Sequence, residues 1–391
     1  MIAKKARMGR ISKILFVTVS DFSEVTGGSV ATAEMVAAFG RNESIELSVV
    51  CAEPPDEIPS KVAENVDEFY YFSGDSEGTV LGHIKEQANM APVLRRAIKK
   101  EDLDAVVSRY SATSVTPPLL TKAYGKPHIL LIRGLAHDRM RYGYILKKIF
   151  WMNVRLADRL YVAFKEIKKE TKKVRKPSQT EAEYFTNAVD PEEFSPTSLE
   201  KARKSLELGL EKDDFVIGFV GSLKDRHMIE KLLLTVSNLN DVNALIVGDG
   251  PERGRLEELV RKEGIEERVT FTGNVKHSEV DRYISACDIM YGVVHPDIPS
   301  NPIKCYEYLA SERPVITSNK REFEFVSRIE VGKTIDTIKM DEVRSAIQDL
   351  RSLTREEILN MGKRGREYVL ENHTWDELPR MVLGDIEDIG I

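Results

Sequence analysis

Short apolar runs alternate with longer amphipathic runs along almost the whole chain. The apolar runs are mostly continuous, which is typical of parallel strands that are covered by helices on both faces. In the first half we predict strands at 13–20, 45–52, 68–73, 105–110, 128–134 and 159–164. In the second half we predict strands at 215–222, 243–250, 269–274, 289–294 and 314–318.

Two such strand–helix series in one chain predict two doubly wound α/β domains that face an interdomain cleft. A chain of 391 residues is also too long for one ordinary core. Turn-forming residues followed by an amphipathic segment place the boundary near 187–214. We therefore expect one domain at 1–195, a second at 196–372 and a closing helix at 373–391.

Composition and charge exclude several classes of protein. No apolar run has the length of a membrane span, and the basic start lacks the apolar core of a secretory signal. The net charge of −6 argues against a nucleic-acid binder. The three cysteines are far apart and form no CxxC pair, which argues against a zinc site and favours a reducing compartment. We predict a cytoplasmic protein.

A cluster of polar and cationic residues follows the first strand of the second domain. In "GFVGSLKDRHMIEKLL" these are Gly221, Ser222, Lys224, Arg226 and His227. Donor groups at the carboxyl end of a parallel strand suit a diphosphate. A solvated charged loop is the better interpretation for any one of these residues, but the cluster as a whole favours a binding site.

The stretch "NPIKCYEYLASERPVITSN", residues 301–319, predicts a loop, a helix and a short strand. Helix N-termini present free N–H groups and favour anions, phosphate above all. Proline has no N–H group, so Ile303 and Lys304 are better donors than Pro302. One carboxylate, Glu307, lies one turn into this helix.

Gly27 and Gly28 follow the first strand, at a strand-to-helix turn. Glycine there allows a ligand to approach the backbone closely. A simple turn explains the pair equally well, but the carboxyl end of the first strand in an α/β sheet favours binding.

The glycines of "ALIVGDGPERGRLEEL" imitate a dinucleotide fingerprint without matching it. Gly248, Gly250 and Gly254 are spaced G-x-G-x-x-x-G, and they follow the second strand of their domain. A Rossmann fingerprint has tighter spacing and lies on the first βα turn, so nicotinamide binding is not favoured.

Arg133 ends a strand of the first domain, and His137 follows it closely. Both are candidate cleft residues, although His137 could equally be a helix-start residue beside Asp138. The chain contains no G-x-S-x-G, P-loop, HExxH or EF-hand sequence, and no nucleophile constellation is recognisable.

Residues 139–155, "RMRYGYILKKIFWMNVR", are basic and aromatic, without an acidic residue. Such a helix could rest on an anionic membrane surface. It could equally pack its aromatic side chains on the sheet and leave its lysines in solvent. Both interpretations remain open at this point.

Taken in order, these segments resemble the family 4 glycosyltransferases of the GT-B fold over nearly the whole chain. The matching segments are "KILFVTVSDFSEVTGGS", "PHILLIRG", "LADRLYVAF", "NAVDPEEFSP", "IGFVGSL", "ALIVGDGPERGRLEEL", "VTFTGNV", "CDIMYGVVHP" and "YEYLASERPVITSN".

The resemblance implies two Rossmann-like domains, with a nucleotide-diphosphate sugar held mainly by the second and the acceptor by the first. It implies sugar transfer with retention at the anomeric carbon, without a cofactor or an obligatory metal. It also implies that the closing helix crosses back to the first domain. Acceptors in the family are often lipid-linked or polysaccharide precursors, which adds weight to a peripheral contact of 139–155 with the inner face of the membrane.

The resemblance also implies roles for individual residues. Glu307 matches the second of two signature glutamates and is expected to bind the ribose hydroxyls of the donor. The expected catalytic residues are Arg226, Arg133 and His137. The expected donor-binding residues are Gly27, Gly28, Gly221, Ser222, Lys224, His227, Gly248, Gly250, Val275, Pro302, Ile303, Lys304 and Glu307.

Four positions depart from the family pattern. Pro299 stands where the first signature glutamate is expected, Ser222 replaces an arginine, His227 a lysine and Arg133 a histidine. Two alternatives therefore stay open. One is a catalytically weakened GT-B protein that binds a nucleotide or a partner enzyme without transfer, and the other is a sugar-nucleotide epimerase of the same fold.

Overall fold

The computed structural model describes residues 11–22, 27–54, 57–74, 79–134, 143–298, 300–336 and 339–389. It divides into two compact units. One comprises Met1–Thr186 together with Trp375–Ile391, and the other comprises Asn187–Thr374. Each of the predicted strands is present, with ends that differ from the prediction by a few residues.

The first unit is a seven-stranded parallel sheet in the order β3-β2-β1-β4-β5-β6-β7. Its strands are β1 (Ser12–Val17), β2 (Ile45–Ala52), β3 (Glu68–Phe72), β4 (Ala105–Arg109), β5 (His128–Ile132), β6 (Arg159–Val162) and β7 (Glu183–Tyr184). The central strand β1 is apolar on both faces because helices cover both sides of the sheet.

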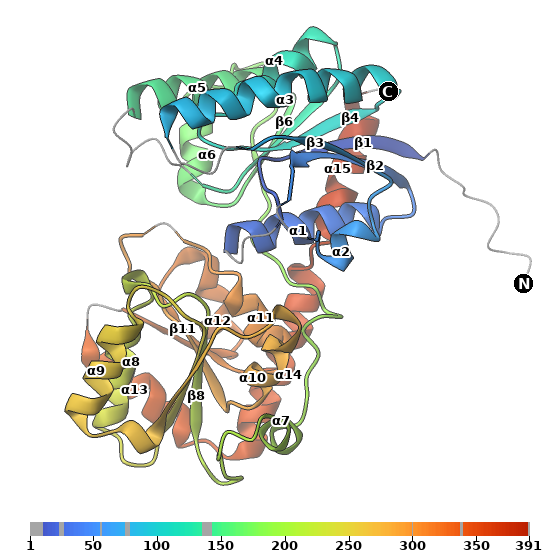
Figure 1. Ribbon diagram of the computed structural model, residues 1–391. Coiled ribbons are helices and arrows are strands. Elements are labelled where there is room, and N and C mark those ends of the chain that lie inside the picture. The colour runs from blue at the N-terminus through green and yellow to red at the C-terminus, as the bar shows by residue number, and fades with distance from the viewer. Residues whose placement is uncertain are drawn as a thin grey trace, which may run out of the picture. The chain divides into compact units, whose positions relative to one another are not determined.

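Helices of the first unit form two layers around this sheet (Figure 1). One layer contains α3 (Val80–Lys100), α4 (Thr116–Ala123) and α5 (Gly143–Leu156), with α6 (Lys165–Lys172) after β6. The other contains α1 (Gly27–Gly40), α2 (Ser60–Ala63) and α15 (Glu377–Ile389). None of the described helices combines the length and the apolar character that crossing a bilayer requires.

The C-terminal helix α15 is anchored to the first unit by a buried polar cluster. The carboxylate of Asp385 accepts hydrogen bonds from Arg159 Nε at 2.7 Å and from the Tyr161 hydroxyl at 2.5 Å. At the start of this segment Trp375 is 1% exposed and packs beside Phe185. The closing segment therefore belongs to the core of the first unit.

The second unit is a six-stranded parallel sheet in the order β10-β9-β8-β11-β12-β13. Its strands are β8 (Val216–Val220), β9 (Asn243–Val247), β10 (Val269–Gly273), β11 (Ile289–Gly292), β12 (Val315–Ser318) and β13 (Gly332–Ile335). Its helices are α7 (Leu199–Leu206), α8 (Ile229–Ser237), α9 (Arg253–Glu263), α10 (Val280–Ser285), α11 (Lys304–Ala310), α12 (Glu324–Arg328), α13 (Met340–Arg351) and α14 (Arg355–Asn372).

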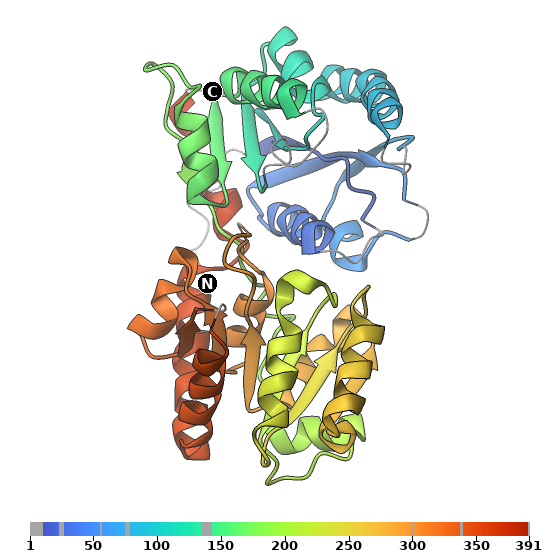
Figure 2. The same cartoon turned by 90° about the vertical axis from the view of Figure 1, so that its left-hand side faces the viewer.

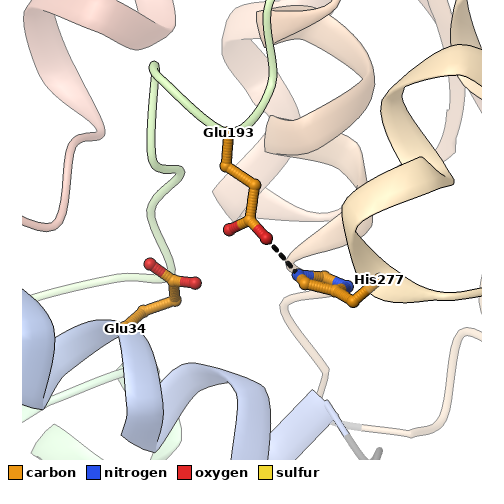
Figure 3. Close-up of side chains that lie close together, drawn as sticks. All are labelled: Glu34, Glu193 and His277. Carbon is orange, nitrogen blue, oxygen red and sulfur yellow. Dashed lines mark ion pairs between the residues drawn. The ribbon is translucent and has the colours of Figure 1, made fainter. Parts of the chain in front are cut away.

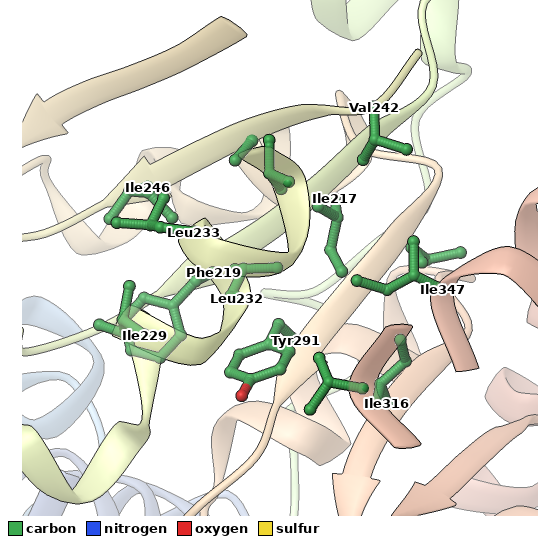
Figure 4. Close-up of a cluster of buried hydrophobic side chains, with 14 of the residues drawn as sticks. Ile217, Phe219, Ile229, Leu232, Leu233, Val242, Ile246, Tyr291, Ile316 and Ile347 are labelled. Carbon is green, nitrogen blue, oxygen red and sulfur yellow. The ribbon is translucent and has the colours of Figure 1, made fainter. Parts of the chain in front are cut away.

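A separate hydrophobic core lies on each face of the second sheet. On one face α8, α9 and α13 lie together in both views of the chain (Figures 1 and 2). Their apolar side chains meet Ile217, Phe219 and Tyr291 of the sheet (Figure 4). On the other face α11 packs on α14 and α7 packs on α10. These two cores hold the strand ends that carry the polar loops.

The structure places the junction between the units earlier than residue 195, our predicted boundary. The segment that begins at Asn187 packs on the second unit: the Val189 N–H donates to the His373 carbonyl at 2.9 Å. Glu193 forms an ion pair with His277 Nε2 at 3.2 Å (Figure 3). Turn-forming residues therefore marked the region of the junction, but tertiary contacts decide which unit they join.

Two short edge strands were not predicted. β7 has two residues, Glu183 and Tyr184, and both are exposed. β13 contains a lysine and a threonine that are only partly buried. Neither strand has the continuous apolar run on which the prediction depended, because an edge strand is covered less than a central one.

Candidate functional site

Most of the predicted donor-binding residues gather at the carboxyl edge of the second sheet. The chain runs outward from β8 to β9 and β10, and then returns to place β11 on the other side of β8. The strand order therefore reverses between β8 and β11. Ligands of open α/β sheets bind at such a switch point, outside the carboxyl ends of the strands.

The loops after β8 and β9 pack directly against each other. The Gly221 N–H donates to the Val247 carbonyl, and the Leu223 N–H donates to the Asp249 carbonyl, both at 2.9 Å. Gly248 has φ +121°, and a Cβ at this position would lie 2.3 Å from the Gly221 carbonyl oxygen. A Cβ at Gly250 would lie 2.5 Å from the Leu223 carbonyl oxygen. Loop packing alone thus accounts for Gly248 and Gly250, and their predicted contact with the donor stays a prediction.

Lys304 is buried beneath the first of these loops. It is the first residue of α11 and is 9% exposed. Its Nζ lies 3.9 Å from the centroid of the Phe219 ring, and a Cβ at Gly221 would lie 2.6 Å from it. No described residue accepts a hydrogen bond from this Nζ. Burial, with a smaller contribution from the charge of nearby Arg226, lowers the pKa of Lys304 to about 7.

His227 is also buried, at 6% exposure. Arg226 Nε donates to His227 Nε2 at 3.4 Å, and His227 Nδ1 has no partner among the described residues. Burial, followed by the charges of Lys304, Arg226 and Lys224, lowers the pKa of His227 to about 2. His227 is therefore neutral at physiological pH, and the positive charge of this loop comes from Lys224 and Arg226, which are both exposed.

Glu307 differs from the prediction in its burial. We expected an accessible carboxylate one turn into the helix, but Glu307 is 6% exposed. Its charge raises the pKa of Lys304 and so partly opposes the effect of burial. The next residue, Tyr308, fixes the end of β8: its hydroxyl accepts from the Val220 N–H at 2.8 Å and donates to the Val220 carbonyl at 3.2 Å.

The predicted helix start lies beside Lys304 and Glu307. Pro302 and Ile303 precede α11, and their carbonyls accept from the N–H groups of Cys305 and Tyr306 at 3.2 and 2.9 Å. Asn301, which the prediction passed over, is 4% exposed, and neither its amide oxygen nor its amide nitrogen has a partner among the described residues. A buried amide of this kind is a candidate ligand group.

The remaining predicted residues lie in other surroundings. Val275 is half-buried and packs against the core that α11 and α14 share. In the first unit Gly27 and Gly28 open α1, as the glycine turn predicted. His137 and Pro299 lie outside the described residues.

Arg133 has structural contacts that the sequence did not indicate. Its Nη1 donates to the carbonyls of Phe185 and Thr186. Its guanidinium also lies 5.7 Å from the Phe185 ring centroid and 5.9 Å from the Trp375 ring centroid. These contacts tie β5 to the end of the first unit, and the catalytic role of Arg133 stays a prediction.

The switch point of the second sheet thus combines a buried ammonium, two exposed cations and a buried amide that has no partner among the described residues. Opposing carboxylate charge comes from Glu307 and from the exposed Asp225. Such an array can stabilise a dianionic leaving group, because charge-assisted hydrogen bonds strengthen where water is excluded.

Comparison with known proteins points to the same chemistry. Residues 200–368 match the family described as glycosyl transferases group 1. Over 205 residues the chain is 28% identical to a GDP-mannose-dependent alpha-(1-6)-phosphatidylinositol monomannoside mannosyltransferase of Mycobacterium tuberculosis, covering 50% of this chain and 53% of that protein. The chain spans about half, or less, of the length of the curated relatives it matches.

Solved structures with the same fold cover nearly the whole chain. Sucrose-phosphate synthase from Thermosynechococcus elongatus is similar with a TM-score of 0.77 at 17% identity, over 97% of this chain and 99% of that one. Anabaena HepE, in complex with UDP-glucose, is similar with a TM-score of 0.72 at 12% identity, over 96% and 99%. Residues 200–368 therefore match the group 1 glycosyl transferases, and the two parallel sheets have the α/β architecture of the GT-B fold.

Proposed function

We propose that this protein transfers a sugar from a nucleotide-diphosphate sugar to an acceptor, with retention at the anomeric carbon. The observation that carries the proposal is the convergence of Lys304, Arg226 and the α11 start on one switch point. The name of the mycobacterial relative and the UDP-glucose in the HepE structure support a nucleotide sugar as the donor.

In this mechanism the departing nucleoside diphosphate is stabilised by positive groups. Arg226 is the best placed for this, since it is exposed and a guanidinium binds two phosphate oxygens at once. Retaining transfer needs no protein nucleophile if the leaving phosphate accepts the proton of the acceptor hydroxyl. As the C–O bond to the diphosphate breaks, the acceptor oxygen forms its bond on the same face and its proton passes to the phosphate. No metal or cofactor enters this scheme.

The test is incubation with a panel of nucleotide sugars and candidate acceptors, with release of nucleoside diphosphate as the readout. For the donor that reacts, Arg226→Ala should lower kcat about a hundredfold and change donor affinity less. Arg344→Ala is the matched control, because Arg344 is an exposed arginine that pairs with exposed Asp341 on α13. A turnover rate that is indifferent to Arg226 would remove this mechanism.

A second candidate is a GT-B protein that binds a nucleotide without transferring sugar. The structural contacts of Arg133 and the burial of Glu307 favour it, since both residues were expected to meet substrates. Nucleotide binding measured by calorimetry, together with no turnover for any donor and acceptor, would establish this alternative.

We further propose a lipid-linked or polysaccharide-precursor acceptor and contact of α5 with an anionic membrane. Tyr144 and Ile145 on α5 are 72% and 56% exposed, and Trp151 is 37% exposed. Lys148 lies 4.6 Å from the centroid of the Tyr144 ring, and Lys147 lies 5.7 Å from that of Trp151. Exposed aromatic and basic side chains on one helix suit the interface of an anionic bilayer.

A further inference from the structure

Arg109 lies at the switch point of the first sheet, where no sequence pattern had placed a functional residue. It is the last residue of β4, which pairs with β1 at the place where the strand order reverses. Its Nη1 donates to the Thr32 hydroxyl on α1. That hydroxyl in turn donates to the Gly28 carbonyl at 2.9 Å. The guanidinium is therefore held against the first turn of α1.

No described residue places an anion beside Arg109. Its Nε is shielded from solvent and has no acceptor, and the Thr32 hydroxyl is its one hydrogen-bond partner among the described residues. Burial lowers the pKa of the Arg109 guanidinium, and no carboxylate of a described residue opposes that effect. Shielding a cation from water without a partner is costly.

Arg203 shows which hydrogen-bond acceptors surround a buried arginine with a structural role in this chain. Its guanidinium donates to the carbonyls of Ala286 and Asp214 at 3.0 and 3.1 Å and to the Asp288 carboxylate at 2.9 Å. Among the described residues, Arg109 binds neither a backbone carbonyl nor a carboxylate. The contrast suggests that Arg109 is reserved for a ligand.

We infer that Arg109 binds an anionic oxygen group, a phosphate or a carboxylate, on the acceptor substrate. The positive end of the 14-residue helix α1 lies at the same turn. A Cβ at Gly27 would meet no atom within 4 Å, so there is open space at this turn. The assignment of the anion to the acceptor rests on the proposed transferase function. The binding of an anion by Arg109 is independent of that function.

The binding test follows the Nε–H signal of Arg109 by ¹H–¹⁵N NMR of the full chain. The signal is assigned as the one that Arg109→Lys removes. Titration with inorganic phosphate, and separately with acetate, should shift it saturably, whereas chloride at equal ionic strength should not. The anion that produces the larger shift of the Arg109 signal is the one that the site prefers, a phosphate or a carboxylate. A signal that neither anion moves would overturn the inference.

Two controls separate direct binding from other causes. In Lys304→Met the phosphate response of Arg109 should persist, and its loss would show that the signal reports on the second unit. Glu24 lies outside the described residues and is the one carboxylate next to α1 in sequence. If Glu24→Gln moves the Arg109 signal while phosphate does not, Arg109 has an internal partner and the inference is wrong.

The kinetic test compares each acceptor sugar with its phosphorylated and uronic acid forms. Arg109→Met should raise KM for the anionic form about tenfold or more while kcat stays within about twofold, and Arg109→Lys should recover part of the loss. Neutral acceptors should not distinguish the variants. An equal effect on neutral and anionic acceptors would contradict the inference. Absence of transfer with any acceptor would instead reject the transferase function, leaving the NMR titration to decide the role of Arg109.

Discussion

At the scale of single residues, Lys304 is a buried cation whose lost hydration opposes stability. Its ammonium lies against the face of Phe219, which compensates part of the lost hydration by a cation–π interaction. Because no described residue accepts a hydrogen bond from it, the site keeps a donor available for an anionic ligand. A diphosphate bound there would raise the pKa of Lys304 again and keep it charged.

We expect Lys304→Met to stabilise the protein without ligand, and most strongly at low pH. The pKa of Lys304 falls from 10.5 to about 7 on folding, so below pH 7 the folded state holds a buried cation. As pH rises from 7 to 10.5, the wild type loses that cost and its free energy of unfolding approaches that of the variant. The gain should be about 1–3 kcal/mol at acidic pH.

Urea unfolding at a series of pH values measures this difference. Lys224→Met is the control, because Lys224 is exposed and should show little change. A stability difference for Lys304→Met that grows with pH would have the wrong sign and would contradict the buried cation.

Glu307 tests the predicted contact with ribose. Glu307→Ala should weaken donor binding by about 2–3 kcal/mol, the cost of charge-assisted hydrogen bonds left unmade, and Glu307→Gln should weaken it less. Because Glu307 is buried, the alanine variant should also lose stability. Calorimetry of nucleotide binding and thermal unfolding separate the two effects; unchanged affinity in a folded alanine variant would refute the contact.

At the scale of elements, the attachment of α15 depends on a few polar contacts as well as on apolar packing. Asp385 on this helix meets Arg159 and Tyr161 of β6, strand and helix being far apart in sequence. Arg41 of the segment after α1 also pairs with Asp376 at 2.9 Å. These contacts select the position of a helix whose apolar face could otherwise slide along the sheet.

We expect Asp385→Ala to destabilise the first unit by about 3–5 kcal/mol, since it leaves a mostly buried guanidinium unpaired. Tyr161→Phe removes only one hydrogen bond to the same carboxylate and should cost about 1.5–3 kcal/mol. In a Trp151→Phe background Trp375 is the remaining tryptophan, and its fluorescence reports directly on this segment. If Asp385→Ala in the Trp151→Phe protein unfolds at the same midpoint as Trp151→Phe alone, apolar packing alone holds α15.

At the scale of the whole molecule, α5 has one buried stripe of side chains and one exposed stripe. Leu146, Phe150 and Val154 are buried against the first sheet, while Tyr144 and Trp151 are exposed beside lysines. The helix thus uses one stripe for the core and leaves an aromatic, basic stripe in solvent. The second stripe is the surface that we propose for membrane contact.

Flotation with liposomes tests this surface on the intact protein. Binding to anionic vesicles should exceed binding to neutral ones at low salt, and Tyr144→Ser with Ile145→Ser should reduce it about tenfold or more. Leu359→Ser is the control, because Leu359 is an exposed leucine on α14 of the second unit, with 45% exposure. Equal recovery with anionic and neutral vesicles would favour a water-soluble acceptor.

The sequence by itself determined the α/β class, the two strand series and the loops that carry the polar residues. It could do so because parallel central strands require continuous apolar runs, and because ligand loops follow the carboxyl ends of such strands. Gly27 and the segments around Arg226 and Lys304 were found in this way.

Only the tertiary structure decided the burial and the contacts of individual side chains. The burial of Lys304 and Glu307, the contacts of Arg133 with Phe185, and the absence of a described carboxylate beside Arg109 all depend on segments far apart in the chain. The charge state and availability of a side chain follow from its solvation and its neighbours, and a linear pattern contains neither. For the same reason the junction at Thr186 and the edge strand β13 became visible only in the folded chain.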